Sequence, residues 1–137
     1  MASFTLFDMH INAHEKVGTI TYGVSSASTD VNSIEDQTES SAHADDQFNA
    51  GTLYFVQAGS TVSTAIWMEG KFARILDYDA SSGKYDLSTV GFTTVSTGAS
   101  SGLIPSETVY GVATPEFNLQ LMNRLANAAL RTLGPFV

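Results

Sequence analysis

The sequence predicts a mainly β protein, namely a single small β-barrel or sandwich with an extended acidic, Ser/Thr-rich arm and one C-terminal amphipathic helix. Three observations support this fold class. Short apolar segments with a period of two recur along the chain, turn-forming residues separate them, and a helical period appears only after Pro115. We therefore expect one domain over residues 1–137, with an extended polar arm or loop at 25–50, a β core at 51–113 and the helix at 114–133.

The first predicted strand lies near the N-terminus. Residues 3–11 alternate between apolar and polar, with one slip at Leu6 and Phe7 that indicates a bulge or a bend. The INAHEK segment that follows is expected to be a connector. The other predicted strands are residues 17–24, 52–57, 62–68, 72–78, 84–90, 92–96 and 108–113.

A hairpin is the strongest local signal in the chain. The segment DASSG separates two of the predicted strands. Asp79, Ser81 and Ser82 favour turns because their side chains bond to the nearby backbone, and Gly83 can adopt a positive φ. The sequence therefore predicts a hairpin with a five-residue loop.

The C-terminal segment changes to a period of three and four residues. Thr114 is a suitable N-cap, Pro115 suits the first helical position, and Gly134 followed by Pro135 ends the pattern. The apolar residues of the predicted stripe are Phe117, Leu121, Met122, Leu125, Ala126, Ala129, Leu130 and Leu133. We expect the first two turns of this amphipathic helix to pack on the chain's own sheet.

Residues 25–50 consist mainly of Ser, Thr, Asp, Glu, Asn and Ala. Few substantial apolar residues occur there, so burial cannot offset the entropy lost on ordering the segment. We therefore predict an arm that becomes ordered on neighbouring subunits, and similar contacts for the apolar segment after the helix. The interface candidates are Val31, Ile34, Phe48, Phe136 and Val137.

The charge pattern argues against nucleic acid and anionic lipid as partners, and the acidic stretch is either a solvated loop or a complement to a basic partner surface. The net charge is −8, and charged residues make up 15% of the chain, whereas roughly 25% is usual. No Lys or Arg occurs between Lys16 and Lys71, and the acidic residues of this stretch would repel phosphates and anionic lipid. Cysteine is absent, and neither a signal peptide nor a long apolar run is visible. We expect binding to neither nucleic acid nor a membrane.

Two groups of residues suggest metal binding, and each has a simpler interpretation. His10, His14 and Glu15 do not form an H-E-x-x-H motif, and we expect the histidines at the end of a strand and in a loop, at a surface or an interface. Asp77 and Asp79 begin a segment that lacks the closing Glu of a calcium loop, so hairpin chemistry explains them. Asp45 and Asp46 are a second acidic pair at which calcium could bind. We expect no metal or cofactor.

The sequence also lacks the signature of an enzyme. No Gly-x-Ser-x-Gly elbow and no glycine-rich phosphate loop with Lys is present. Tyr54, Trp67, Tyr78 and Tyr85 allow two interpretations, an exposed platform for a sugar or peptide, or the core and cross-strand pairs usual for strand aromatics. We expect a non-enzymatic protein.

Several short segments resemble small structural proteins of tailed bacteriophages and related viruses. The resemblance covers about residues 51–134. Its elements are Gly70 and Lys71, the hairpin from Ile75 to Gly83, Tyr110, the helix start at Pro115 and Glu116, and the segment from Asn127 to Arg131. The resemblance implies a barrel-containing virion component at the head, neck or tail, present in many symmetric copies.

The resemblance leads to three functional alternatives. The first is a virion protein that cements or decorates a capsid and contacts the major capsid protein and its own copies. The second is a neck or tail adaptor subunit of the same kind of particle, in contact with neck or tail proteins. The third belongs to another class, a β-sandwich module for carbohydrate binding or adhesion.

Overall fold

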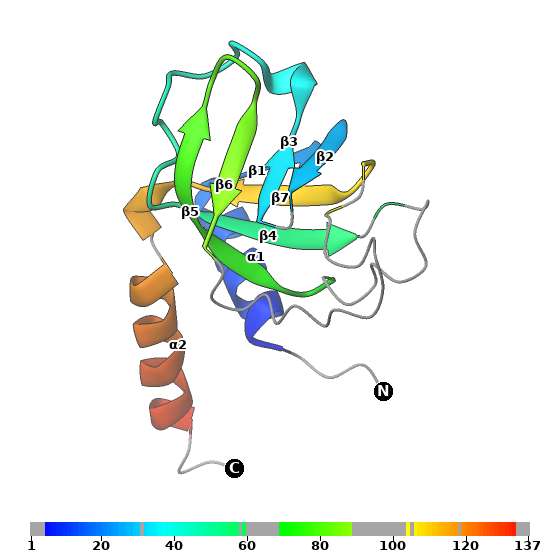
Figure 1. The fold of residues 1–137 in the computed structure, drawn as a ribbon. Coiled ribbons are helices and arrows are strands. Elements are labelled where there is room, and N and C mark those ends of the chain that lie inside the picture. The colour runs from blue at the N-terminus through cyan, green and yellow to red at the C-terminus, as the bar shows by residue number, and fades with distance from the viewer. Residues whose placement is uncertain are drawn as a thin grey trace.

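The computed structural model describes residues 5–30, 32–57, 59, 69–88, 104, 106–117 and 119–133. Within these residues the chain forms a curled antiparallel sheet of seven strands, with helix α1 against the sheet and helix α2 projecting from one end (Figure 1). The helices are α1 (Leu6–Val17) and α2 (Leu119–Leu133), with short 3-10 helices η1 (Gln37–Glu39) and η3 (Pro115–Phe117). The strands are β1 (Ile20–Val24), β2 (Ala27–Asp30), β3 (Ser33–Glu35), β4 (Thr52–Gln57), β5 (Phe72–Asp79), β6 (Lys84–Leu87) and β7 (Val109–Ala113).

The order of the strands explains the curl. The sheet runs β1-β7-β4-β5-β6-β3-β2, so β1 and β2 form its two edges. Only Ser25 and Ser26 connect these two strands, and three peptide steps span at most about 11 Å. The sheet must therefore curl until its edges meet. Ser25 lies at the junction, where its backbone bonds to Thr108 and Glu107 beside β7 while Ser26 bonds to Glu35 of β3.

The strand predictions are confirmed for most of the described residues. β4 has the predicted bounds, and β1, β5, β6 and β7 lie within one to three residues of the predicted segments. The predicted strands at 62–68 and 92–96 lie outside the described residues. The mainly β fold with a C-terminal helix is thus confirmed, whereas the sheet extends beyond 51–113 because β1, β2 and β3 belong to it.

The prediction of a strand at 3–11 is wrong, because this segment begins α1. Thr5 and Asp8 form a capping box, in which the Thr5 amide donates to Asp8 Oδ2 at 2.8 Å and the Asp8 amide donates to Thr5 Oγ1 at 3.2 Å. The Thr5 amide and the Thr5 hydroxyl, which both donate to Asp8 Oδ2, hold the pKa of Asp8 below its usual value. Gly18 ends the helix with a φ of 71°, which glycine adopts without strain.

The prediction of an extended arm at 25–50 is also wrong for the described residues. β2 and β3 add to the sheet next to β6, and residues 36–50 run past the β5–β6 turn and then along β5. Backbone bonds hold this segment in place: the Asp46 amide donates to Tyr78 at 3.1 Å and the Ala50 amide to Ile75 at 2.9 Å. The chain's own strands therefore supply hydrogen-bond partners for backbone amides of this polar segment.

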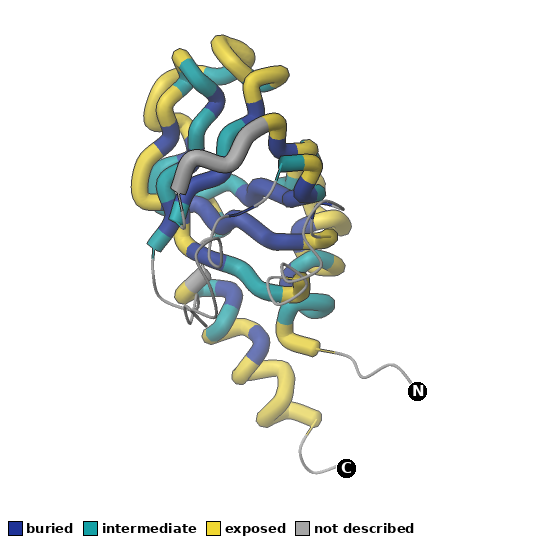
Figure 2. Tube along the Cα trace, turned by 45° about the vertical axis from the view of Figure 1, so that its right-hand side comes forward, coloured by how far each residue is buried: buried dark blue, intermediate teal, exposed yellow. Residues whose placement is uncertain are grey.

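The core lies inside the curl. Figure 2 shows the buried positions concentrated in the strands, whereas the far half of α2 is exposed. The buried cluster on the concave face consists of Ile34, Phe48, Leu53, Phe55, Ala73, Ile75, Tyr78, Tyr85, Leu87, Ile104, Tyr110 and Val112. On the other face of the sheet, α1 packs against Tyr54 of β4 and Phe72 of β5. α1 thus packs on one face of the sheet, and Phe48 from residues 36–50 joins the cluster on the other.

The predicted hairpin is confirmed, but its loop has four residues, 80–83, because Asp79 already pairs with Lys84. The Ser81 amide and hydroxyl both donate to Asp79 Oδ1, at 2.8 and 2.6 Å, and Gly83 has a φ of 69°. These two bonds hold the pKa of Asp79 below its usual value. Turn chemistry therefore accounts for Asp79, as the sequence indicated.

Candidate functional site

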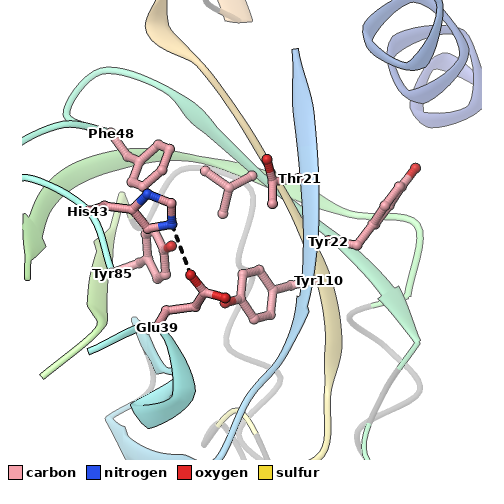
Figure 3. A pocket seen from close by; sticks show the side chains of 8 residues that line it. Thr21, Tyr22, Glu39, His43, Phe48, Tyr85 and Tyr110 are labelled. Carbon is pink, nitrogen blue, oxygen red and sulfur yellow. Dashed lines mark hydrogen bonds and ion pairs between the residues drawn. The ribbon is translucent and has the colours of Figure 1, made fainter. Parts of the chain in front are cut away.

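A small pocket opens where side chains of residues 36–50 meet the inside of the curled sheet. Side chains from β1, β6, β7 and residues 36–50 line it (Figure 3). The lining residues are Thr21, Tyr22, Glu39, His43, Phe48, Tyr85, Tyr110 and Val112. The space that a water-sized sphere can enter is about 10 Å³, which is room for about one water molecule.

A hydrogen-bonded pair, His43 and Glu39, and an aromatic cluster form the wall of this pocket. His43 Nε2 lies 2.9 Å from Glu39 Oε2, and the His43 ring meets Phe48 edge-on with the ring centroids 5.0 Å apart. Tyr78 and Tyr85 continue the cluster with a centroid separation of 4.7 Å. Aromatic contacts of this geometry stabilise a core, so the pocket is part of the packing between residues 36–50 and the sheet.

Asp36 is the buried polar centre beside the pocket, with 1% of its surface exposed. Its Oδ2 accepts a 2.7 Å bond from the Tyr110 hydroxyl, and its Oδ1 accepts from the amide and the hydroxyl of Thr38 at 3.0 and 2.5 Å. Burial raises the pKa of Tyr110, and the neighbouring Tyr85 and Asp36 raise it further. The Tyr110 phenol therefore stays protonated and serves as a hydrogen-bond donor.

A second buried polar cluster lies between α1 and the sheet. His10 and His14 are one helical turn apart on the face of α1 that packs on β4, and both contact the Tyr54 hydroxyl, at 3.2 and 3.1 Å. All three side chains are buried. The expectation that the histidines lie at the end of a strand and in a loop, at a surface or an interface, is therefore wrong.

The hydrogen bonds of this cluster form one chain. His14 Nδ1 lies 2.8 Å from the Thr19 hydroxyl, and the Tyr54 hydroxyl lies between His14 Nε2 and His10 Nδ1. With its single proton, the Tyr54 hydroxyl can donate to one neutral imidazole and accept from the other. Both imidazoles are neutral in this arrangement. Burial lowers the pKa of each, and the neighbouring His14 lowers that of His10 further.

The exposed side of α2 is the third feature with functional potential. Met122 and Ala126 are buried on one side of the helix. Leu125, Leu130 and Leu133, which we call the leucine face, are 52%, 56% and 56% exposed. Neither helix in the described part of the chain is long and apolar enough to cross a membrane.

The structure separates the five interface candidates. Ile34 and Phe48 lie in the chain's own core, with 0% and 4% of their surface exposed, so neither presents its side chain to a partner in this conformation. The candidates Val31, Phe136 and Val137 lie outside the described residues. Sequence reasoning also missed Asp36 and Thr19, because their partners are fixed by the fold rather than by a local motif.

The described aromatic side chains that were considered for a binding platform are buried. Tyr54, Tyr78 and Tyr85 are 0%, 0% and 2% exposed, so they form no surface platform, and Trp67 lies outside the described residues. Burial raises the pKa of all three phenols.

Asp77 is a hydrogen-bond acceptor on the surface. Its Oδ1 accepts a 3.3 Å bond from the side-chain Nδ2 of Asn49, which also donates to Asp46 Oδ1 at 2.9 Å. Among the described residues, no three His, Asp or Glu side chains are grouped closely enough to hold a metal ion.

Comparison with known proteins adds no relative. The chain matches no protein family, no curated protein and no solved structure. The leucine face, the pocket and the two buried polar clusters therefore have to be interpreted from their own chemistry.

Proposed function

We propose that this chain is a non-enzymatic structural subunit of a virus particle, which cements or decorates a capsid by contacting neighbouring subunits and further copies of itself. The observation that carries this proposal is the leucine face of α2. Its three leucines are more than half exposed, on a helix of which Met122 and Ala126 are the buried residues among those described.

Burying the exposed leucines of α2 against a neighbouring subunit would stabilise the helix. Fully burying a leucine side chain contributes about 1.5–3 kcal/mol, so covering three half-exposed leucines would contribute about 1 kcal/mol each. Helices of this length depend mainly on tertiary packing for their stability, because propensity alone is marginal below about 15 residues. A contact with a neighbouring subunit would provide that packing for the far half of α2.

The surface chemistry agrees with a protein partner. A net charge of −8 opposes association with nucleic acid and anionic lipid, whose phosphates attract basic surfaces. In a particle of many copies, contacts that are weak individually add together because each bound subunit is held by several neighbours. A small, rigid sheet with an unpaired helix face suits that role.

A neck or tail adaptor subunit would use the same contacts, and the resemblance over residues 51–134 applies to it equally. The two alternatives differ in where the chain would lie in the particle, on the capsid or at the neck or tail. The third alternative, a carbohydrate-binding module, loses its main support, because three of the four aromatic residues considered for a platform are buried.

Sedimentation velocity of the full chain tests the proposal. We expect the average mass to increase over about a hundredfold range of protein concentration, as mass action requires for a self-associating subunit. Negative-stain electron microscopy of the concentrated sample should then show particles of uniform size. A chain that remains monomeric over the whole range contradicts the proposal.

A further inference from the structure

We infer that the pocket shown in Figure 3 binds the ammonium group of a lysine side chain that a neighbouring subunit presents. The inference rests on the proposed function, because it names a contact by which a neighbour would be held. Three properties of the pocket carry it, namely an open mouth with a carboxylate, a floor of aromatic rings, and room for one small group.

The pocket is open to solvent on one side and closed by the core on the other. At its mouth, Thr21 is exposed, and the side chains of Glu39 and His43 are 30% and 26% exposed. Its floor is formed by four buried residues, namely Phe48, Tyr85, Tyr110 and Val112. A long side chain can therefore enter from solvent and place only its end group among the rings.

The floor of the pocket is suited to a cation. The Tyr85 ring contacts two other rings, with centroid separations of 5.8 Å to Phe48 and 5.7 Å to Tyr110. These three rings border a common space in Figure 3, whereas the Tyr22 ring points away from it and bonds to Glu15 through its hydroxyl. Because an aromatic ring is negative on its faces, it attracts a positively charged group and not a carboxylate or a phosphate.

Negative charge lies around the pocket, and no Lys or Arg in the described part of the chain pairs with it. Glu39 lies at the mouth, and Asp36 is buried beside the floor. Burial and the neighbouring Tyr78 raise the pKa of Tyr85. The charges of Glu39 and Asp36 raise it further, so the field of both carboxylates reaches this ring. The structure describes all six Lys and Arg residues, and none of these forms an ion pair with Glu39 or Asp36.

Size and hydrogen bonding select lysine over arginine. The pocket has room for about one water molecule, in a space of about 10 Å³. An ammonium group is compact and carries three donors on a flexible stem, whereas the guanidinium group of arginine is planar and wider. Glu39 Oε2 already contacts His43, but Oε1 has no hydrogen-bond partner among the described residues and is available to accept from the ammonium group.

Titration of the isotope-labelled full chain with Nα-acetyl-lysine amide, followed by nuclear magnetic resonance, tests the site. We expect saturable shifts of the ring signals of Phe48, Tyr85 and Tyr110, with a Kd of about 10 mM for one ion pair supported by aromatic rings. The matched neutral compound, in which the lysine Nε is also acetylated, should cause no saturable shift. Equal shifts with both compounds would overturn the inference, because the charge would then have no part in binding.

A pair of variants tests the carboxylate at the mouth. Glu39→Gln keeps the shape and removes the charge, so it should weaken binding of the lysine derivative by about fivefold. Glu116→Gln is the matched control, because it removes the same charge at an exposed position that does not line the pocket, and its Kd should stay within about twofold of the parent value. Unchanged signals from α1 in both variants would show that the fold is retained. An unchanged Kd for Glu39→Gln would overturn the inference, since the amine would then be held by the general charge of the protein.

Two further amines test the identity of the occupant. Nα-acetyl-arginine amide should bind at least about threefold more weakly than the lysine derivative, and equal binding would contradict the selection of lysine. Putrescine represents a free amine. If it binds more than about tenfold more tightly than the lysine derivative, the pocket takes a free polyamine, and the assignment to a neighbouring subunit is overturned.

The outcomes separate failure of the inference from failure of the proposed function. If none of the amines causes a saturable shift while the chain assembles in sedimentation velocity, the subunits meet without this pocket and only the inference fails. If the lysine derivative binds as expected but the chain stays monomeric over the whole concentration range, the ammonium site is supported and the proposed function is contradicted.

Discussion

The Tyr110 hydroxyl donates a 2.7 Å hydrogen bond to Asp36, which lies 74 positions earlier in the chain. Both residues are buried, with 2% and 1% of their surface exposed. The bond ties β7 to the segment that follows β3, and it makes residues 36–50 part of the sheet's own packing. The first prediction concerns this pair.

Tyr110→Phe should destabilise the protein by about 2 kcal/mol, because a buried carboxylate loses one of its donors. Urea unfolding followed by tyrosine fluorescence or circular dichroism would measure the change. Tyr22→Phe is the matched control, since its ring is 44% exposed, and it should change the stability by less than about 1 kcal/mol. In a double-mutant cycle with Asp36→Ala, a coupling free energy near zero would contradict the role assigned to this bond.

The second prediction concerns pH and the cluster of His10, His14 and Tyr54. Burial holds the pKa of both imidazoles below the unfolded value of 6.5, so the unfolded chain binds more protons than the folded chain at mildly acidic pH. The contribution of the two neutral histidines is therefore complete above pH 6.5. It is lost as the pH falls through 6.5 toward the lower folded-state pKa values.

Thermal or urea unfolding between neutral pH and pH 5 measures this effect. The parent chain should lose stability as the pH falls, and a His10→Gln/His14→Gln variant should have a smaller slope even though its stability at neutral pH is lower. His43→Gln, which changes the histidine outside α1, should keep the steep slope. Equal slopes for the parent chain and the His10→Gln/His14→Gln variant would show that the pair does not control the response.

Some elements of the fold could be predicted because their sequence signals lie in adjacent residues. The β4 strand and the β5–β6 hairpin were predictable because periodicity and turn residues are properties of adjacent positions. For α1, the apparent alternation at 3–11 was misleading. The informative signals were the Thr5 and Asp8 capping box and Gly18 after the last helical turn.

The behaviour of residues 25–50 was not predictable from composition. Ile34 and Phe48 are too few to suggest a folded segment, but the structure places both in a core built by strands from β4 to β7. Asp36 likewise gains its partner from a distant strand. A polar composition predicts disorder only when the rest of the chain offers no surface to pair with.

The third prediction is that residues 33–50 are protected in the isolated chain. β3 pairs with β6, and the amides of Asp36, Ser41, Asp46 and Ala50 bond to the β5–β6 turn or to β5, so the exchange of these four amides should be nearly as slow as that of β4. Residues 127–133 of α2 are the internal comparison, and their exchange should be faster because their side chains are exposed. Rapid exchange and proteolysis confined to 33–50, which leave a resistant 51–133 fragment, would show that this segment needs neighbouring subunits.

The last prediction compares two glycines that share a positive φ but differ in their surroundings. Gly70 has a φ of 77° and nothing near the position of an added Cβ, so Gly70→Ala should cost about 1 kcal/mol for the backbone conformation alone. Gly83 has a φ of 69°, and an added Cβ would collide with the Asp36 carbonyl oxygen. Gly83→Ala should therefore cost about 2–4 kcal/mol, since the crowding adds to the same backbone penalty. Urea unfolding of the two variants measures the difference. Equal losses of stability would mean that residues 36–40 do not pack against the β5–β6 turn in solution, because the collision exists only when that segment is in place.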